Sequence, residues 1–437
     1  MKPLSDIVAC VCDHGRFVHV ARTLGKTLGT VYYTSPEERD CPVIRDACVG
    51  DGFDEITRVK SLWRVKEKCD LFVFLDIGFE DEQAELRDQG FPIWGPGGAG
   101  ALESNKGLFL KTLAETDLPV PPHIVIKGLT NLSLHLHDVE DVYIKVSKFR
   151  GDWETLHWTN WDEMEGTLDS YAVLFGSLKE EITFYVFEKI DTEIEDGVDA
   201  YLVGGRWPET VLHGTEIKDK AYIGTMQKFS DLPEEVRKVN ETFRPILDKA
   251  SNGQPMKFST EIRITKDGES FFTDPTCRFG SPPSQGECVL IKNLAEIIAR
   301  GAIENVCVEP ETEDEFVVQV NVSLDGDRTE WNSFKLEDDV EEALKGGFCC
   351  RVNGRLGLPP IKEYYTTEVG YLCATGKTLA AAIESLRDLK ENLPDGLMCD
   401  FSSLADVLKE LESSKNQGIG LGGAKIPDPE IVVAEMS

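Results

Sequence analysis

Short apolar runs alternate with polar helical stretches in the first part of the chain. The apolar runs lie at residues 7–11, 31–33, 71–75 and 92–94. Continuous runs of this length are typical of parallel strands that are buried on both faces. Residues 17–28 carry a helical pattern between the first two runs. This alternation predicts a doubly wound α/β domain over residues 1–95.

The pattern changes after a glycine-rich stretch at residues 95–100. We expect a helix that is capped by Ser104 and runs to about Asp117, because serine is a favoured N-cap residue. Further strands are expected at residues 142–146, 183–187, 201–203, 258–265 and 270–273, and an amphipathic helix at residues 233–250. Asp267-Gly268 favours a tight hairpin between the last two strands. These elements predict two α+β lobes within residues 96–315, one of them at about residues 120–190.

The last part of the chain has a third pattern. Residues 316–323 alternate as a strand, and Gly376-Lys377-Thr378 opens a helix with regularly spaced leucines. We therefore expect a small α+β domain over residues 316–412. Residues 413–437 begin with a stretch rich in Ser, Gly and Asn and are expected to form a flexible tail.

Composition and charge narrow the choice of partners. The 437 residues include 46 basic and 78 acidic ones, for a formal charge of −32. Such a charge disfavours binding to duplex nucleic acid or anionic membranes. The chain has no apolar run of membrane-spanning length, and its N-terminus does not resemble a signal peptide. Its 12 cysteines show no C-x-x-C spacing, so we expect reduced thiols and a cytoplasmic location.

The most informative polar residues lie on the expected hairpin. Glu261 and Asp274 fall on its two strands, so both carboxylates can point to one side, and Arg278 follows closely. Magnesium commonly takes one or two carboxylates together with nucleotide phosphates, and an arginine there can stabilise a transferring phosphoryl group. A hairpin with both acids on its solvent-facing side would show the same spacing, and the residues alone leave the two interpretations equal.

Other basic residues are candidates for binding anions. Lys145 lies inside an apolar strand, where it either pairs with an anion or reaches out to solvent. Lys148 follows in a cationic loop that could fold over phosphates, and Lys106 begins a helix. The loop Asp13-His14-Gly15-Arg16 joins the first strand to the first helix. It can hold an anion at the helix start, or it can be an ordinary turn with a surface arginine.

The order of these features resembles the ATP-grasp superfamily, and within it glycinamide ribonucleotide synthetase (phosphoribosylamine–glycine ligase). Residues 95–121 are similar to that family's G-P … L-E-x-S-K … G-I-P segment. Residues 274–285, which read D-P-T-C-R-F-G-S-P-P-S-Q, resemble its E-x-N-x-R-F-G-D-P-E-x-Q. Residues 376–382 resemble its late G-x-T-L-x-x-A helix, and residues 13–16 take the place of its G-G-R-E-H loop.

The resemblance implies an ADP-forming ligase that joins a small-molecule carboxylate to an amine, as a monomer or homodimer. It implies a pre-ATP-grasp domain, a central ATP-grasp fold and a small C-terminal α+β domain. The implied cofactors are ATP and Mg²⁺, or Mn²⁺ in its place. The implied site residues are Glu261, Asp274 and Thr276 for the metal, Arg278 and Lys145 for catalysis, Lys106, Lys145 and Lys148 for phosphates, Glu188, Lys189, Ile190 and Asp191 for adenine, Asp199 for ribose, and Asp13, His14, Gly15, Arg16 and Ser281 for the other substrate.

Some positions depart from the family pattern. The loop after Lys145 has a single glycine where the family has a glycine-rich lid, and Ser281-Pro282-Pro283 replaces Asp-Pro-Glu beside the expected amino-acid site. Two alternatives therefore stay open beside purine synthesis. One is a ligase that joins an amino acid to a different amine, such as a modified nucleotide. The other is a protein that binds ATP without catalysis.

Overall fold

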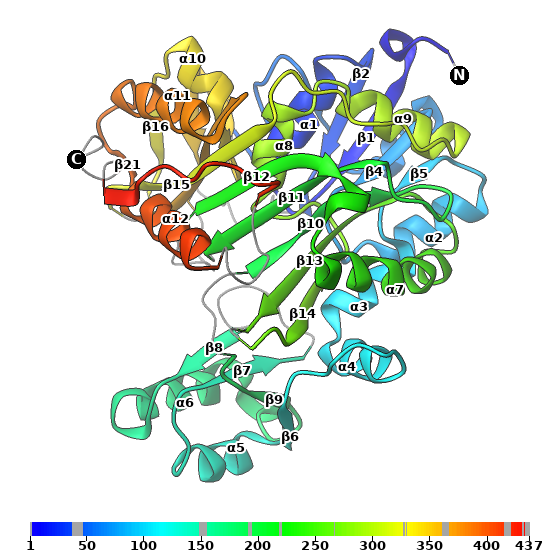
Figure 1. Ribbon diagram of the computed structural model, residues 1–437. Helices are drawn as coiled ribbons and strands as arrows, with labels where there is room; N and C mark the ends of the chain where they lie inside the picture. Colours follow the sequence, from blue (N-terminus) through cyan, green and yellow to red (C-terminus); the bar gives the residue numbers. More distant parts are fainter. Residues whose placement is uncertain are drawn as a thin grey trace. The chain divides into compact units, whose positions relative to one another are not determined.

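A computed structural model of the chain forms two compact units (Figure 1). It describes residues 2–36, 47–147, 155–190, 195–217, 221–265, 267–326, 328, 330–360, 367–414, 421–430 and 432. Unit 1 comprises residues 1–100, 193–261 and 276–437, and unit 2 comprises residues 101–192 and 262–275. The chain therefore passes between the units four times.

Unit 1 begins with a five-stranded parallel sheet in the order β3-β2-β1-β4-β5. Its strands are β1 (Val8–Cys12), β2 (Thr30–Thr34), β3 (Thr57–Arg58), β4 (Leu71–Phe74) and β5 (Ile93–Trp94). The helices in contact with it include α1 (Val18–Gly25), α2 (Glu80–Asp88) and α9 (Leu294–Glu304). The predicted apolar runs are confirmed as strands, and β1 and β4 are almost wholly buried.

Unit 1 also contains most of a large sheet in which β13-β10-β11-β12-β15-β20-β17 are neighbours and β21 pairs with β15. These strands are β10 (Glu195–Leu202), β11 (Thr210–Ile217), β12 (Ala221–Lys228), β13 (Met256–Ile264), β15 (Phe316–Leu324), β17 (Leu344–Gly346), β20 (Glu368–Gly376) and β21 (Leu397–Cys399). The register from β10 through β20 is antiparallel. The mostly antiparallel sheet after a parallel one matches the α/β class expected from the sequence.

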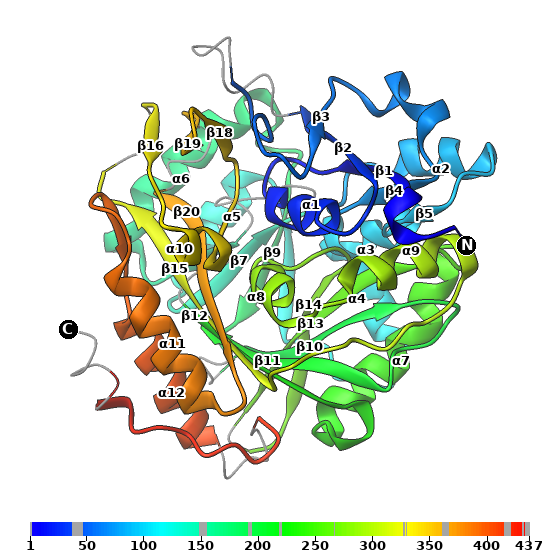
Figure 2. The same cartoon turned by 90° about the horizontal axis from the view of Figure 1, so that it is seen from above.

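Helices cover the large sheet. Contacts with its strands are made by α7 (Glu234–Ala250), α8 (Ser284–Leu290), α11 (Leu379–Glu391) and α12 (Ser402–Ser414). In Figure 2, α11 and α12 lie at the opposite end of this sheet from α7. The apolar stripe predicted for α7 is buried through Val236, Val239, Phe243 and Leu247. A smaller sheet is formed by β16 (Asn332–Phe334), β18 (Cys350–Val352) and β19 (Arg355–Leu358). Helix α10 (Asp338–Ala343) contacts β17 and β20 of the large sheet.

Unit 2 is built around a four-stranded antiparallel sheet in the order β6-β9-β7-β8. Its strands are β6 (His123–Lys127), β7 (Val142–Val146), β8 (Thr155–Trp158) and β9 (Thr183–Glu188), and its helices are α4 (Lys106–Ala114), α5 (Leu129–Leu136) and α6 (Trp161–Phe175). Trp158, Tyr171 and Phe184 are central to its core. Strand β14 (Ser270–Thr276) returns the chain to unit 1.

The start of helix α4 differs from the prediction. Ser104 is not the cap of the expected helix, because it ends the short helix α3 (Gly100–Ser104) and Asn105 caps α4 instead. All cysteines that the structure describes are free thiols, as expected. None of the helices within the described ranges is long and apolar enough to cross a membrane. The predicted domain boundaries remain predictions.

Candidate active site

Two lysines and an aspartate form a compact cluster of charges in unit 2. The ammonium groups of Lys106 and Lys145 each form an ion pair with one carboxylate oxygen of Asp274. Lys106 also donates a hydrogen bond to the carbonyl oxygen of Thr273 at 3.2 Å. The lysine side chains are 5% and 15% exposed and that of Asp274 is 16% exposed, so the cluster is largely withdrawn from water. The structure thus brings together three residues that the sequence predicted for the ATP site.

Local structure explains why these lysines face the aspartate. Asn105 Oδ1 accepts a hydrogen bond from the Leu108 N–H at 3.1 Å, which starts helix α4 at Lys106. In β7, Val142, Ile144 and Val146 are buried and the residues between them are half-buried. Alternation along a strand therefore places Lys145 on the face opposite to the three core residues. Its predicted half-buried position is confirmed.

Charge dominates the protonation of this cluster. Burial alone would raise the pKa of Asp274, but the two neighbouring ammonium groups outweigh burial and hold this pKa well below its usual range. Asp274 is therefore ionised under all ordinary conditions. Two cations converge on Asp274 here, and ammonium groups form strong hydrogen bonds with anionic oxygens.

The remaining nucleotide residues predicted in unit 2 lie at the end of a strand. Glu188 is the last residue of β9, and Lys189 and Ile190 follow it. The Lys189 ammonium contacts Asp141 Oδ2 at 3.1 Å. Lys148 and Asp191 lie outside the described residues. The adenine role of this segment remains a prediction.

The residues predicted to bind the metal offer suitable donors. Mg²⁺ takes one or two carboxylates and leaves other positions to phosphate and water, and Glu261 and Asp274 fit that donor set. Thr276 Oγ1 donates to Glu261 Oε1 at 3.4 Å. Glu261 and Thr276 belong to unit 1 and Asp274 to unit 2, so their joint role remains a prediction. Within the described part of the chain, no group of three or more His, Cys, Asp or Glu side chains is placed to hold a metal.

Asp199, predicted to bind ribose, lies inside unit 1. It is buried on β10 and accepts a hydrogen bond from the Tyr222 hydroxyl at 2.7 Å. Burial raises the pKa of Asp199, and the nearby Lys257 ammonium opposes that rise. Lys257 itself is paired with Glu287 in the same interior. The contacts of Asp199 are thus those of a buried polar network, and its role toward ribose remains a prediction.

The loop at residues 13–16 lies at a position in the parallel sheet that favours ligand binding. Strand order reverses between β1 and β4, and open α/β sheets bind ligands outside the carboxyl ends of the strands at such a point. Asp13 follows β1 and is buried. Its carboxylate accepts hydrogen bonds from the N–H groups of Gly15 and Phe17, at 2.9 and 2.5 Å, and from the Tyr33 hydroxyl. Asp13 therefore shapes the loop from within.

Burial raises the pKa of Asp13 from 3.8 to about 6, although its hydrogen bonds lower it in part. Between those pH values the folded protein binds more protons than the unfolded chain, so the stability due to Asp13 falls as pH rises. We expect the free energy of unfolding of the wild type, relative to Asp13→Asn, to fall by on the order of 2–3 kcal/mol between about pH 4 and pH 6. Urea unfolding of both proteins across this range measures the difference, and a pH-independent difference would contradict the assignment.

A second residue at the switch point, Asp76, was not singled out from the sequence. It follows β4 and connects two residues that were predicted. Asp76 Oδ2 lies 3.1 Å from His14 Nδ1, and Asp76 Oδ1 lies 3.4 Å from Arg278 Nε. The His14 ring stacks on Phe79 with centroids 4.6 Å apart. The sequence feature that could have identified Asp76 is its place directly after a buried apolar run. Such a position is the carboxyl end of a strand, where open α/β sheets bind ligands.

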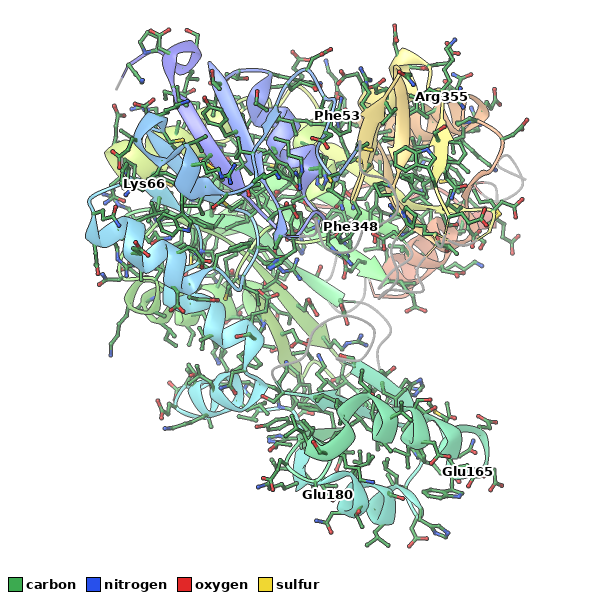
Figure 3. The ribbon with its side chains drawn as sticks, turned by 180° about the vertical axis from the view of Figure 1, so that it is seen from behind. Phe53, Lys66, Glu165, Glu180, Phe348 and Arg355 are labelled. Atoms are coloured by element: carbon green, nitrogen blue, oxygen red, sulfur yellow. The ribbon has the colours of Figure 1, made fainter. Side chains whose placement is uncertain are left out.

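The other predicted substrate residues are Gly15 and Arg16 in this loop and Ser281 just before α8. Gly15 has φ +100°, and a side chain there would come within 2.9 Å of Phe348, which is labelled in Figure 3. Arg16 lies 5.9 Å from the Phe348 ring and 4.0 Å from Glu368. Ser281 Oγ accepts a hydrogen bond from Gln285 Nε2 at 2.8 Å. Asp13, His14 and Arg278 thus surround one switch point, whereas Ser281 contacts the start of α8.

Comparison with solved structures defines the class: the chain has the ATP-grasp fold. The parallel N-terminal sheet and the antiparallel sheets that follow it agree with this fold. No family model and no curated protein sequence matches the chain. The fold predicted from the sequence is thereby confirmed.

Three of the similar structures are enzymes that catalyse different reactions. Phosphoribosylamine–glycine ligase from Thermotoga maritima has a TM-score of 0.61 at 14% identity, covering 90% of this chain and 98% of that one. L-amino acid ligase from Bacillus licheniformis has a TM-score of 0.57 at 14% identity, covering 91% and 99%. The biotin carboxylase domain of Hydrogenobacter thermophilus 2-oxoglutarate carboxylase, a dimer in complex with MgADP, ADP and bicarbonate, has a TM-score of 0.61 at 12% identity, covering 98% of both chains.

Proposed function

We propose that the chain is an ADP-forming ligase that joins a carboxylate to an amine and binds ATP with Mg²⁺. The observation that carries this proposal is the convergence of Lys106 and Lys145 on the Asp274 carboxylate. A pair of largely buried lysines that point to one place is suited to phosphate oxygens, which form strong charge-assisted hydrogen bonds with lysine. The ATP-grasp fold supports the same interpretation.

Each residue has a defined part in this proposal. MgATP would supply the phosphoryl group that activates the carboxylate. Lys106 and Lys145 would bind phosphate oxygens, and Asp274, with Glu261 and Thr276, would hold the metal. Arg278 would stabilise the charge on the acyl phosphate. Phosphoryl transfer depends mainly on positioning and charge, so none of these residues needs to act as a covalent nucleophile.

The substrates of the proposed reaction are narrowed by resemblance. The likeness to phosphoribosylamine–glycine ligase supports glycine and phosphoribosylamine, and with them a place in purine synthesis in the cytoplasm. The likeness to L-amino acid ligase supports the alternative, in which an amino acid is joined to another amine. Ser281 occupies the position of the family's aspartate, beside the expected amino-acid site. Both sets of substrates should therefore be tested.

Trapping with hydroxylamine tests the proposal even while the amine substrate is unidentified. Hydroxylamine attacks acyl phosphates and converts them to hydroxamates. The protein is incubated with ATP, Mg²⁺ and hydroxylamine, and with each member of a panel of amino acids and other small carboxylates. We expect at least one carboxylate to give ADP together with one equivalent of hydroxamate per ADP. Phosphoribosylamine and a panel of amines then replace hydroxylamine to identify the acceptor.

The outcomes separate the candidate functions. Hydroxamate with glycine and amide formation with phosphoribosylamine would support purine synthesis. Hydroxamate with another amino acid would support the alternative ligase. If calorimetry shows that ATP binds but no carboxylate gives ADP or hydroxamate, the protein binds ATP without catalysis and the proposed function is wrong.

A further inference from the structure

His14 and Asp76 form a pair at the switch point of the parallel sheet. The two residues come from different loops, one after β1 and one after β4, and Nδ1 of His14 lies 3.1 Å from Asp76 Oδ2. The Asp76 side chain is 9% exposed, whereas that of His14 is 36% exposed. Stacking on Phe79 fixes the plane of the imidazole ring. The carboxylate is thus withdrawn while part of the ring reaches solvent.

This geometry determines which ring nitrogen is basic. A carboxylate only accepts hydrogen bonds, so Nδ1 carries the ring proton and donates a hydrogen bond to Asp76. In the neutral ring Nε2 then has a free lone pair. Among the described residues His14 forms no hydrogen bond through Nε2. The His14 side chain is partly exposed, and a Cβ added at Gly78 would lie 3.8 Å from Nε2. The Asp76 carboxylate therefore orients the His14 ring, and Nε2 is available to accept a proton.

The amide-forming step of the proposed ligase reaction needs a base. The attacking amine nitrogen forms a bond to the acyl carbon while the C–O bond to phosphate breaks, and phosphate leaves with the electron pair. The nitrogen becomes positively charged in the process and must lose a proton before a neutral amide results. A positioned histidine is the side chain most often used to accept such a proton.

We propose that His14 is the proton acceptor for the attacking amine and that Asp76 is the positioning residue that holds its ring. The inference rests on the proposed function. The proton passes from the amine nitrogen to His14 Nε2, and the Asp76 carboxylate stabilises the imidazolium that forms. Arg278, beside the same carboxylate, is the residue assigned to the acyl phosphate, which places base and electrophile on one side of the sheet.

Neighbouring charged groups are poorly suited to this role. Both oxygens of the Asp13 carboxylate are occupied by N–H and O–H donors from Gly15, Phe17 and Tyr33. Arg278 stays protonated at any pH at which proteins work. Arg16 is a cation near Glu368. Among the described residues at the switch point, His14 has a ring oriented by a carboxylate and a second nitrogen that can accept a proton.

Two small nucleophiles that differ in acidity test the base. Once bonded to the acyl carbon, the nitrogen of hydroxylamine is a much stronger acid than that of methylamine, so its proton passes readily to water, whereas the methylamine nitrogen depends on a base. We expect His14→Gln to change the hydroxamate rate by less than about twofold and to reduce N-methylamide formation, with the best carboxylate of the panel, by about 10²-fold. Raising the pH should restore the methylamine rate in the variant more steeply than in the wild type, because hydroxide then accepts the proton in place of His14.

His137→Gln is the matched control. His137 is an exposed histidine whose Nδ1 lies 2.9 Å from Asp138 Oδ1, so this substitution also breaks a histidine–carboxylate pair, and both rates should stay at the wild-type level. Equal losses with hydroxylamine and methylamine in His14→Gln would assign His14 to binding or folding. Unchanged rates with both nucleophiles would also overturn the base assignment.

A readout that needs no substrate separates this inference from the proposed function. Nitrogen NMR of the ring, assigned with His14→Gln, should show neutral His14 protonated on Nδ1 in the wild type and shifted toward Nε2 protonation in Asp76→Asn. An Nε2–H ring in the wild type would overturn the inference even if ligase activity is found. If His14 is protonated on Nδ1 but no carboxylate gives hydroxamate, the proposed ligase function is wrong. The role of His14 as a base in that reaction is then wrong as well.

Discussion

Asp274→Asn is expected to lower ADP formation by at least about 10³-fold at saturating ATP, the scale of losing a main electrostatic contact in a phosphoryl-transfer site. The neutral amide removes the charge that fixes both Lys106 and Lys145 and that we propose binds the metal. It also replaces one of the two carboxylate oxygens with an NH2 group, whose N–H donors face one of the ammonium groups. Coupled assay of ADP release, with the carboxylate identified by hydroxamate trapping, measures the loss.

Glu181→Gln provides the control for Asp274→Asn. Glu181 is also paired with a lysine of unit 2, Lys127, but both side chains are more than 60% exposed, and such surface pairs contribute little. The rate should therefore match the wild type. Circular dichroism must show that Asp274→Asn is folded at the assay temperature. A folded Asp274→Asn protein with undiminished ADP formation would mean that the cluster is not the phosphate centre.

The second large effect concerns stability. We expect Glu287→Gln to lower the free energy of unfolding by about 3–5 kcal/mol, because it removes the carboxylate that is paired directly with the buried Lys257 ammonium. The Lys257 and Glu287 side chains are 4% and 0% exposed. Glu287 Oε2 has no hydrogen-bond partner among the described residues, and burial raises the pKa of Glu287. Chemical unfolding of the purified variant measures the change.

Replacing both members of the pair distinguishes charge from packing. The double variant Lys257→Met, Glu287→Leu contains no buried charge at these positions, and its stability should recover most of the loss, since apolar replacement of buried ion pairs is often neutral or better. Glu296→Gln, which breaks the exposed contact with Arg300 on α9, should cost less than about 0.5 kcal/mol. A mild effect of Glu287→Gln, similar to that of Glu296→Gln, would show that Lys257 is not held by Glu287.

Local periodicity was enough to predict the elements that carry the charge cluster. The alternation in residues 142–146 placed Lys145 on a half-buried face, and Asp267-Gly268 indicated the turn that brings Asp274 back along the hairpin. Those features depend on neighbours within a few residues, which a sequence shows directly. The partner of Lys145 does not follow from its own strand, because Asp274 lies far away along the chain.

Other features depend on spatial order that local patterns do not contain. Ser104 and Asn105 are both favoured N-caps, and only the helix start shows that Asn105 fulfils this role. Asp76 meets His14 because β4 lies beside β1, a neighbour relationship that four apolar runs cannot specify. Asp199 reaches Tyr222 across the large sheet, so its burial could not be predicted from β10 alone.

The hairpin of β13 and β14 has a consequence for the order in which the protein forms during translation. Residues 262–275 belong to the same compact unit as residues 101–192. They are made only after about 70 intervening residues, roughly four to fourteen seconds later at ordinary rates of elongation. Asp274 is among the late residues, so Lys106 and Lys145 leave the ribosome well before their carboxylate exists. The nascent chain must therefore carry an incomplete unit through that interval, in which a chaperone would find exposed apolar surface to bind.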